Sequence, residues 1–405
     1  METFQNKVVS RESGGASDRL GEPRICMPTF SAFSKHAFRA GLREAQDVLA
    51  ACDAVDFIEL EPSSGFRFKE HWLMRLTYHD PTRRVVSLNP GLRPVRLTKD
   101  YDLFVLVCAH WRDLWYANAI PGWRDHCKTS ICWIDELWAK DAPTLERWLP
   151  ILNKFEHIIV GVNGSSEALS DVIGRHCDFM PGAVDAIRFS PYPNPSARVI
   201  DIYSIGRRHQ GVHRALLDLA ARREFFYVHD TFQTGDSQTP DHREHREMYA
   251  NFAKRSRFFV LTPGKANVPH ETGGQADISF RYFEGSAAGA VLIGQKPDCE
   301  PFRQMFDWPE AVIEIEPDGS DAAGVILNLL AEPEQLREIS SRNAEEALRR
   351  HDWVYRWRQI FDIAGLDPTP AMEAREKRLS ELAESAQRVS RDARMFSSIE
   401  AGQSL

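Results

Sequence analysis

Short apolar segments alternate with helical segments along this chain, and no other feature restricts the possible folds as strongly. Residues 103–107 read Leu-Phe-Val-Leu-Val and are apolar at every position, not only at every second one. Strands of this kind are buried on both faces, as in parallel sheets that carry helices on both sides. The sequence therefore predicts an α/β fold built on parallel sheets.

Two series of such segments follow one another. The first predicts strands at 25–27, 55–60, 103–108, 130–134 and 158–162, with helices at 35–49, 111–118, 143–149 and 165–173. The second predicts strands at 199–205, 225–229, 258–261, 290–293 and 312–315, with helices at 212–222, 243–254, 281–289 and 323–330. Two similar α/β halves imply a cleft between them, which is where ligands commonly bind.

A proline-rich segment separates the two series. Three prolines within residues 191–195 prevent a helix and make a stiff connection. A chain of 405 residues is also long enough for two cores of ordinary size. We therefore predict a disordered lead at 1–23, an N-terminal domain at 24–188 and a hinge at 189–198. A C-terminal domain at 199–366 and a C-terminal helix with a tail at 367–405 follow.

Charge and cysteine content exclude several classes of protein. The formal net charge is −8 and the basic residues are scattered, so we expect no nucleic acid partner. The seven cysteines are odd in number and mostly lie in apolar segments, which favours free thiols and a cytoplasmic protein. No apolar run approaches the roughly 18 residues that span a bilayer, so neither export nor a membrane span is expected.

The stretch 281–294 joins a polar helix start to a small-residue turn and a buried strand. If residues 283–288 form a short helix, Glu284 in its first turn faces the crevice beyond the carboxyl ends of the strands. Ala287, Ala288 and Gly289 would let this helix lie close to the sheet. A carboxylate at that place can accept both hydroxyls of a ribose. An ordinary helix-turn-strand unit with a solvated glutamate is the alternative.

A second candidate site is the turn after the first strand of the second half. Gly206, Arg207 and Arg208 directly precede a helix in that turn. Backbone N–H groups and guanidinium groups can together bind a diphosphate there. Arginine side chains in a solvated surface turn are the alternative.

These motifs resemble those of GT-B glycosyltransferases, in the branch related to the spore-coat CgeB-like proteins and the group 1 glycosyl transferases. Residues 281–289 resemble the donor-binding signature of this branch, with its Arg-x-Phe-Glu-x-x-Ala-x-Gly core. The helix that carries Tyr249 and the terminal His-Asp-Trp element at 351–353 resemble further parts of it. The resemblance covers about residues 178–364, and the order of its pieces is more specific than any one of them.

The resemblance implies two Rossmann-like domains that face each other across a cleft. It implies that the second domain holds a nucleoside diphosphate sugar, with Glu284 on the ribose and with Arg207 and Arg208 on the diphosphate, while Arg281 steadies the donor site. The first domain would hold the acceptor. Nothing in the resemblance calls for a metal ion or for a cofactor other than the donor substrate.

Two positions depart from the family pattern. Gln210 stands where a lysine is common, and Ala276 stands where many retaining enzymes of this type carry a second glutamate. Arg208, or Lys265 after the strand at 258–261, can supply the missing positive charge. For the missing carboxylate, Glu271 and Asp277 in the loop at 270–277 are the candidates that can approach the sugar. A loop with no role in ligand binding is the alternative.

The acceptor side is predicted from strand ends of the first half. Asp135 and His110 follow apolar strands, at the edge where open α/β sheets bind ligands. Either is a candidate for the catalytic base, and Asp135, with Glu136 beside it, is preferred. Caps of the following helices are the alternative role for both.

We predict no metal site, because the pair Asp100 and Asp102 precedes its strand and lies at the opposite end. His242 and His245 could share a face of a helix, but they have no third ligand at a diagnostic spacing. Arg243, Glu244 and Arg246 indicate a solvated segment.

A long charged helix is predicted from Met372 onward. Leu379, Leu382, Ala386 and Val389 recur at intervals of three and four and mark one face of it. This face is expected to pack on the chain's own body or on a partner, and the second choice would make a homo-oligomer. The helix thus offers a contact surface.

The leading hypothesis is a metal-independent glycosyltransferase that moves a sugar from a nucleoside diphosphate sugar to a hydroxyl of a glycan, a lipid-linked or a protein acceptor. Retention and inversion at the anomeric carbon both stay open. A non-catalytic binding or assembly protein of the same fold is the main alternative, favoured by Ala276 and Gln210. A different two-domain enzyme, such as a sugar-nucleotide epimerase, is the third.

Overall fold

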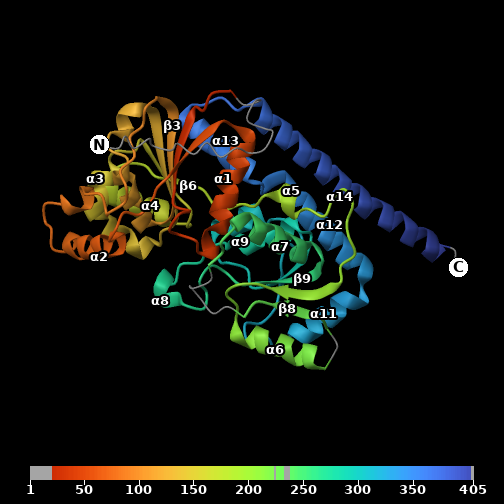
Figure 1. The fold of residues 1–405 in the computed structure, drawn as a ribbon. Coiled ribbons are helices and arrows are strands. Elements are labelled where there is room, and N and C mark those ends of the chain that lie inside the picture. Colours follow the sequence, from red (N-terminus) through yellow and green to blue (C-terminus); the bar gives the residue numbers. More distant parts are fainter. Residues whose placement is uncertain (1–20, 223–224, 232–237, 403–405) are drawn as a thin grey trace. The chain divides into compact units, whose positions relative to one another are not determined.

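The computed structural model describes residues 21–222, 225–231 and 238–402, with side chains up to residue 389, and its chain divides into two compact units (Figure 1). Neither unit is continuous in sequence. Of the described residues, the first unit takes 21–35, Leu49–Pro181 and Trp357–Ala371, and the second takes His36–Val48, Gly182–Arg356 and those from Met372 onward. Three of the boundaries fall inside helices, namely α1 (Ala40–Cys52), α13 (Trp353–Ala364) and α14 (Pro370–Gly402).

The first unit contains a parallel sheet of six strands in the order β2-β1-β3-β4-β5-β6. Its strands are β1 (Ile25–Thr29), β2 (Val55–Glu59), β3 (Tyr101–His110), β4 (Cys127–Glu136), β5 (His157–Val160) and β6 (Asp178–Phe179). The two long central strands pair over most of their length, with Val105 opposite Ile131. Phe104 and Val105 point to opposite faces of the sheet and are both fully buried, which confirms the predicted double-sided burial.

Helices and short 3-10 segments complete the first unit. They are α2 (Phe66–Thr77), α3 (Leu149–Leu152), α4 (Ser165–Ile173), η3 (Val85–Ser87), η4 (Trp111–Ala119), η5 (Trp123–His126) and η6 (Ala139–Trp148). Tryptophan side chains fill much of the space between these segments and the sheet. The rings of Trp115 and Trp148 meet edge to face at 5.6 Å on one side, and Trp133 meets Trp357 of α13 at 6.1 Å.

The second unit contains a parallel sheet of five strands in the order β11-β10-β9-β7-β8. Its strands are β7 (Ile200–Ser204), β8 (Tyr227–His229), β9 (Ser256–Leu261), β10 (Val291–Gly294) and β11 (Ile313–Glu314). Its helices are α5 (Ala186–Phe189), α6 (Gln210–Ala221), α7 (His242–Lys254), α8 (Pro269–Thr272), α9 (Phe280–Ala287), α10 (Glu300–Met305), α11 (Ala322–Ala331) and α12 (Pro333–Arg350). The strand order changes direction around β7, so the carboxyl ends of β7 and its neighbours form the expected ligand edge.

Helix α14 (Pro370–Gly402) forms the long predicted C-terminal helix (Figure 1, dark blue). Leu379, Leu382 and Ala386 are buried within the second unit, whereas Val389 is exposed. The hydroxyl of Ser341 on α12 donates to the carbonyl oxygen of Ala386 at 2.7 Å. Three of the four residues of the predicted face therefore pack on the chain's own body.

The passage between the units differs from the predicted hinge. The chain leaves the first unit after Pro181, and the proline-rich segment at 189–198 lies inside the second unit. Packing explains the shift, because Phe189 is buried and its ring contacts the ring of Tyr249 on α7 at 5.4 Å. Most of the predicted lead, 1–20, is outside the described residues. Helices α2 and α12 were not predicted.

No helix in the described part of the chain combines the length and the apolar character that crossing a bilayer requires.

Candidate functional site

The turn after β7 is held in place by Asp230, the residue that follows β8. Gly206 adopts a left-handed backbone with φ of +74°, and its N–H donates to Oδ2 of Asp230 at 2.7 Å. Arg208 Nη1 donates to the carbonyl oxygen of Asp230 at 2.8 Å and to its Oδ1 at 3.1 Å. Sequence reasoning had not selected Asp230, although a carboxylate at the end of a neighbouring strand was a usable signal. The predicted phosphate turn is thus rigidly connected to the adjacent strand.

Arg281 reaches the same turn from the first turn of α9. Its Nη1 donates to the carbonyl oxygen of Ile205 at 2.9 Å. A Cβ atom added to Gly206 would lie 2.6 Å from this Nη1. The positive φ therefore favours glycine at residue 206, and a side chain there would displace the guanidinium group of Arg281.

The other predicted basic residues gather at this edge as well. Lys265 Nζ forms an ion pair with Glu271 at 2.9 Å. This lowers the pKa of the Glu271 carboxyl, chiefly through the hydrogen bond from Lys265 and also through the charge of Arg207. Lys265 and Arg207 therefore act on one carboxylate. Arg208 lies beside Arg207 on the turn, and Arg281 contacts the turn from α9. The structure brings the predicted diphosphate ligands together within the second unit.

Two nitrogens of this basic group are buried without a hydrogen-bond partner among the described residues. They are Nη1 of Arg207 and Nε of Arg281. A buried donor that lacks an acceptor costs stability, so such atoms need an explanation. An anion bound against the Gly206 turn would provide the acceptors.

Glu284 lies in the second turn of α9, because this helix begins at Phe280 and not at residue 283. Only 5% of its side chain is exposed, so the solvated alternative does not apply. Its Oε1 accepts a short hydrogen bond from Arg246 Nη1, and its Oε2 accepts from the hydroxyl of Tyr249 at 2.7 Å. Burial and the charge of Glu284 hold the pKa of Tyr249 well above its usual value, which keeps this hydroxyl a donor.

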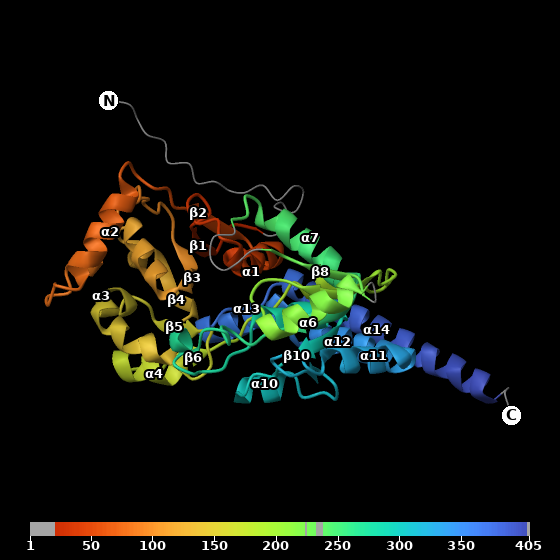
Figure 2. The same cartoon turned by 90° about the horizontal axis from the view of Figure 1, so that it is seen from below.

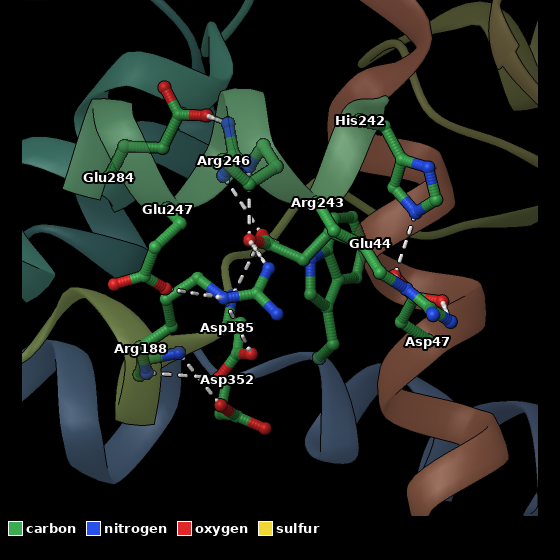
Figure 3. A network of polar contacts seen from close by, with 12 residues as sticks. Glu44, Asp47, Asp185, Arg188, His242, Arg243, Arg246, Glu247, Glu284 and Asp352 are labelled. Atoms are coloured by element: carbon green, nitrogen blue, oxygen red, sulfur yellow. Dashed lines mark hydrogen bonds and ion pairs between the residues drawn. The ribbon is translucent and has the colours of Figure 1, made fainter. Parts of the chain in front are cut away.

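Arg246 connects Glu284 to a second carboxylate, Glu44 on α1 (Figure 3). Its Nε donates to Glu44 Oε1 at 3.0 Å and its Nη2 donates to Oε2 at 2.9 Å. Burial disfavours the charge on Arg246, but the two carboxylates outweigh it and raise its pKa. The prediction that Arg246 belongs to a solvated segment was wrong, because the residue is 3% exposed.

Glu44 is the centre of this network. It also accepts from the backbone N–H of Asp185 at 3.0 Å, from Arg188 Nη1 at 3.2 Å and from Trp353 Nε1 at 3.3 Å. The structure therefore gives Glu44 three further donors besides Arg246, two from the α5 segment and one from the start of α13. A carboxylate held in this way fixes the position of Arg246 and, through it, that of Glu284.

The small-residue turn after α9 brings this helix against the sheet, as the sequence predicted. Gly289 has φ of +61°, and a Cβ at Gly285 would lie 2.6 Å from Leu292 Cδ2. Arg198 lies below the turn, where its Nη2 donates to the carbonyl oxygens of Ala288 and Gly289. The end of α9 is thus fixed by close contacts and by a buried guanidinium group.

His242 and His245 do not form a shared ligand site, because His242 pairs with Asp47. The Nε2 of His242 contacts Asp47 Oδ2 of α1 at 2.7 Å, and Arg243 binds the same carboxylate. Within the described ranges, no group of three or more His, Cys, Asp and Glu side chains is arranged to hold a metal ion.

In the first unit, His110 and Asp135 lie at the carboxyl edge of the sheet. His110 is paired with Glu136 across β3 and β4, which places Asp135 beside them. The imidazole Nδ1 of His110 accepts from the N–H of Arg112 at 3.2 Å and caps η4. Asp135 is partly exposed, and the absence of a side chain at Gly161 leaves it room, since a Cβ there would lie 3.0 Å from its Oδ1.

Sequence reasoning missed Glu59 at the same edge. Its carboxylate accepts from the hydroxyl of Thr29 at 2.9 Å, from the hydroxyl of Ser31 at 2.7 Å and from the N–H of Ala32 at 2.6 Å. Glu59 thereby orders the loop after β1. An acidic residue at the last position of a strand was the available signal.

Comparisons with known proteins agree with this arrangement. Residues 208–362 match the family model described as glycosyl transferase-like. The structure is similar to the trehalose-6-phosphate synthase OtsA, with a TM-score of 0.54 and 11% identity over 85% of this chain and 100% of that chain. It is also similar to an alpha-glucosyltransferase solved with UDP and a 13-mer DNA, with a TM-score of 0.51 and 10% identity over 85% and 100%.

These likenesses show the fold, which is that of the GT-B glycosyltransferases and confirms the predicted fold class. No curated protein matches the chain.

Proposed function

We propose that this chain is a glycosyltransferase that takes a sugar from a nucleoside diphosphate sugar without the help of a metal ion. The observation that carries the proposal is the pair of buried nitrogens of Arg207 and Arg281 beside the Gly206 turn, which have no hydrogen-bond partner in the part of the chain that the structure describes. The glycosyl transferase-like match and the GT-B fold support it.

The diphosphate would bind at the Gly206 turn. Arg207 and Arg281 offer free donors, while Arg208 and Lys265 add positive charge next to them. Fixed positive groups stabilise the negative charge that develops on a departing diphosphate. In this way guanidinium groups can perform the charge neutralisation that a metal ion performs in other transferases.

The ribose would bind at the carboxylate of Glu284. Each carboxylate oxygen can accept two hydrogen bonds, and each has one protein donor, from Arg246 or from Tyr249. One acceptor position per oxygen therefore remains for the two ribose hydroxyls. Arg246 holds the carboxylate in place, and hydrogen bonds to a charged group are stronger than neutral ones.

The acceptor would bind at the carboxyl edge of the first unit. Asp135 or His110 would take the proton of the attacking hydroxyl, and Glu59 would order the neighbouring loop. We propose a hydroxyl of a glycan, a lipid-linked or a protein acceptor. The net charge of −8 disfavours a nucleic acid acceptor.

A panel of nucleoside diphosphate sugars, incubated with the protein and with candidate acceptors, tests the proposal. Mass spectrometry of the products should show release of one nucleoside diphosphate together with a glycosylated acceptor, or with the free sugar if water takes the place of the acceptor. A non-catalytic protein of the same fold, which Gln210 and Ala276 favour, would bind a nucleotide but release no product. An epimerase would change the sugar and leave it on the nucleotide.

A further inference from the structure

Helix α2 of the first unit exposes three large apolar side chains in a row. Phe68, Trp72 and Leu76 are spaced by four residues, and 69%, 47% and 49% of their surfaces are exposed. Residues at this spacing lie on one face of a helix. We call this row the outer face of α2.

The exposure does not come from a loosely attached helix. Phe66 and Thr77 at its two ends are buried, and the ring of Phe66 contacts the ring of Phe33 at 5.1 Å. Glu70 accepts a hydrogen bond from the hydroxyl of Tyr116 at 2.8 Å. The helix is therefore firmly docked by its inner face, and its outer face is presented to solvent. In both views of the fold, α2 lies at the border of its unit (Figures 1 and 2).

Further apolar side chains continue the outer face. These are neighbours in the sequence: Tyr78 is 57% exposed directly after the helix, and Leu88 is 51% exposed after η3, which packs on α2. Five of the thirteen large apolar side chains that are exposed in the described part of the chain thus lie within residues 68–88. A concentration of this kind marks an interaction surface.

The segment that carries the outer face is basic in sequence, in contrast to the chain as a whole, although its Arg83 and Arg93 pair with Glu146 and Glu61 from outside the segment. Residues 66–96 hold seven Lys and Arg but only two Asp and Glu, while the whole chain has a net charge of −8. Both acidic residues are engaged locally, Glu70 by Arg67 and Tyr116 and Asp80 by Thr82 and the N–H of Val85.

Arginines also flank the aromatic rings. The guanidinium of Arg75 lies 5.6 Å from the ring of Trp72, and that of Arg147 lies 4.5 Å from the ring of Tyr78.

We propose that the outer face of α2 binds an anionic membrane surface. Helices that lie in the membrane interface carry Trp, Phe and Leu on one side and Lys and Arg around them. An anionic lipid surface satisfies both features at once, because the headgroups attract the basic residues and the acyl boundary takes up the apolar side chains. A nucleic acid backbone would use only the basic residues and leave the apolar side chains in water. This proposal is independent of the nucleotide chemistry described above.

Sedimentation with lipid vesicles tests the proposal on the full-length protein. We expect binding to vesicles of phosphatidylcholine with phosphatidylglycerol, much weaker binding to phosphatidylcholine alone, and release at high salt. The variant Phe68→Ser/Trp72→Ser/Leu76→Ser should lose about tenfold or more in affinity, because insertion scales with the apolar area removed from water. The matched control Val199→Ser/Leu217→Ser/Leu327→Ser removes equally exposed apolar side chains elsewhere and should bind as the wild type.

A second variant guards against misfolding of the first. Lys69→Glu/Arg75→Glu keeps the apolar row and should also lose binding to the anionic vesicles. The proposal is overturned if the wild type ignores these vesicles, or if both outer-face variants bind as well as the wild type. It is also overturned if light scattering shows a dimer that the apolar variant disperses, because the occupant is then a second copy of the chain.

Discussion

Arg246 and Glu284 form a buried ion pair that joins helix α7 to helix α9. Their side chains are 4% and 5% exposed. The same guanidinium group holds Glu44 with its other two nitrogens, so one positive charge lies between two buried carboxylates. This arrangement holds the residue proposed to bind ribose in a fixed position beside a buried positive group.

Loss of Arg246 should strongly destabilise the fold. Arg246→Met leaves Glu44 and Glu284 buried without their shared counter-charge, and breaking a buried pair in this way costs about 3–5 kcal/mol. Urea unfolding measures the difference. The control Arg257→Met removes a surface pair with Asp201 whose arginine is 46% exposed, and it should cost less than about 1 kcal/mol. If both variants lose the same small amount of unfolding free energy, the buried network stabilises the fold no more than a surface ion pair does.

Glu284 should discriminate between a ribose and a deoxyribose. If its carboxylate accepts from the ribose hydroxyls, the wild type should bind a 2′-deoxynucleoside diphosphate about tenfold more weakly than the ribonucleotide, because a hydrogen bond to a charged group is lost. Glu284→Gln keeps the shape of the side chain and should reduce this ratio. Titration calorimetry with both nucleotides gives the four affinities. An unchanged ratio in the variant would place the ribose elsewhere.

The sequence predicted the turns that form this site better than the distant residues with which its side chains pair. The basic turn after β7 and the glycine turn after α9 were predicted because both depend on local residue types. Arg246 was misjudged, since its neighbours on α7 are polar and its partner Glu44 lies 202 positions away in the sequence. A buried charge reads as a solvated one whenever the partner that neutralises it comes from a distant segment.

Fold elements show the same limit. Helix α4 was predicted at its observed ends, 165–173, because a glycine stands on each side of an amphipathic segment. Helix α2 was missed, because its apolar residues lie on two faces, of which only one packs on its own unit. The return of residues 357–371 to the first unit depends on tertiary packing, which a local pattern does not encode.

Gly206→Ala should weaken nucleotide binding beyond its effect on stability. The new Cβ would lie 2.6 Å from Arg281 Nη1, and a φ of +74° costs a residue with a side chain about 1–2 kcal/mol. Gly174→Ala is the matched control, because its φ is +71° but no atom lies within 4 Å of its Cβ. Both variants should lose similar stability in thermal unfolding. Only Gly206→Ala should lose nucleotide affinity. If both variants bind the nucleotide equally well, the turn does not contact the ligand.

Acid stability should depend on Asp47. Burial raises the pKa of its carboxyl, but the hydrogen bonds from His242 and Arg243 outweigh this and lower the pKa to about 2. A carboxyl with a lowered pKa stabilises the folded state above its unfolded pKa of about 3.9, and this contribution disappears as the pH falls towards 2. The advantage of the wild type over Asp47→Asn should therefore shrink by about 2 kcal/mol between about pH 5 and pH 2. Urea midpoints across this range measure it, and a constant difference would argue against the pairing.

Calorimetric titration of the wild type and of Arg281→Gln with UDP, GDP, ADP and dTDP tests the central claim most directly, namely that the Gly206 turn binds a diphosphate. We predict that at least one of these nucleotides binds the wild type and that the variant binds it about tenfold more weakly, because a charged donor is lost. Arg257→Gln, which removes a surface charge of the same unit, should bind as the wild type does. The claim is contradicted if none of the four nucleotides binds, or if Arg281→Gln binds as tightly as the wild type.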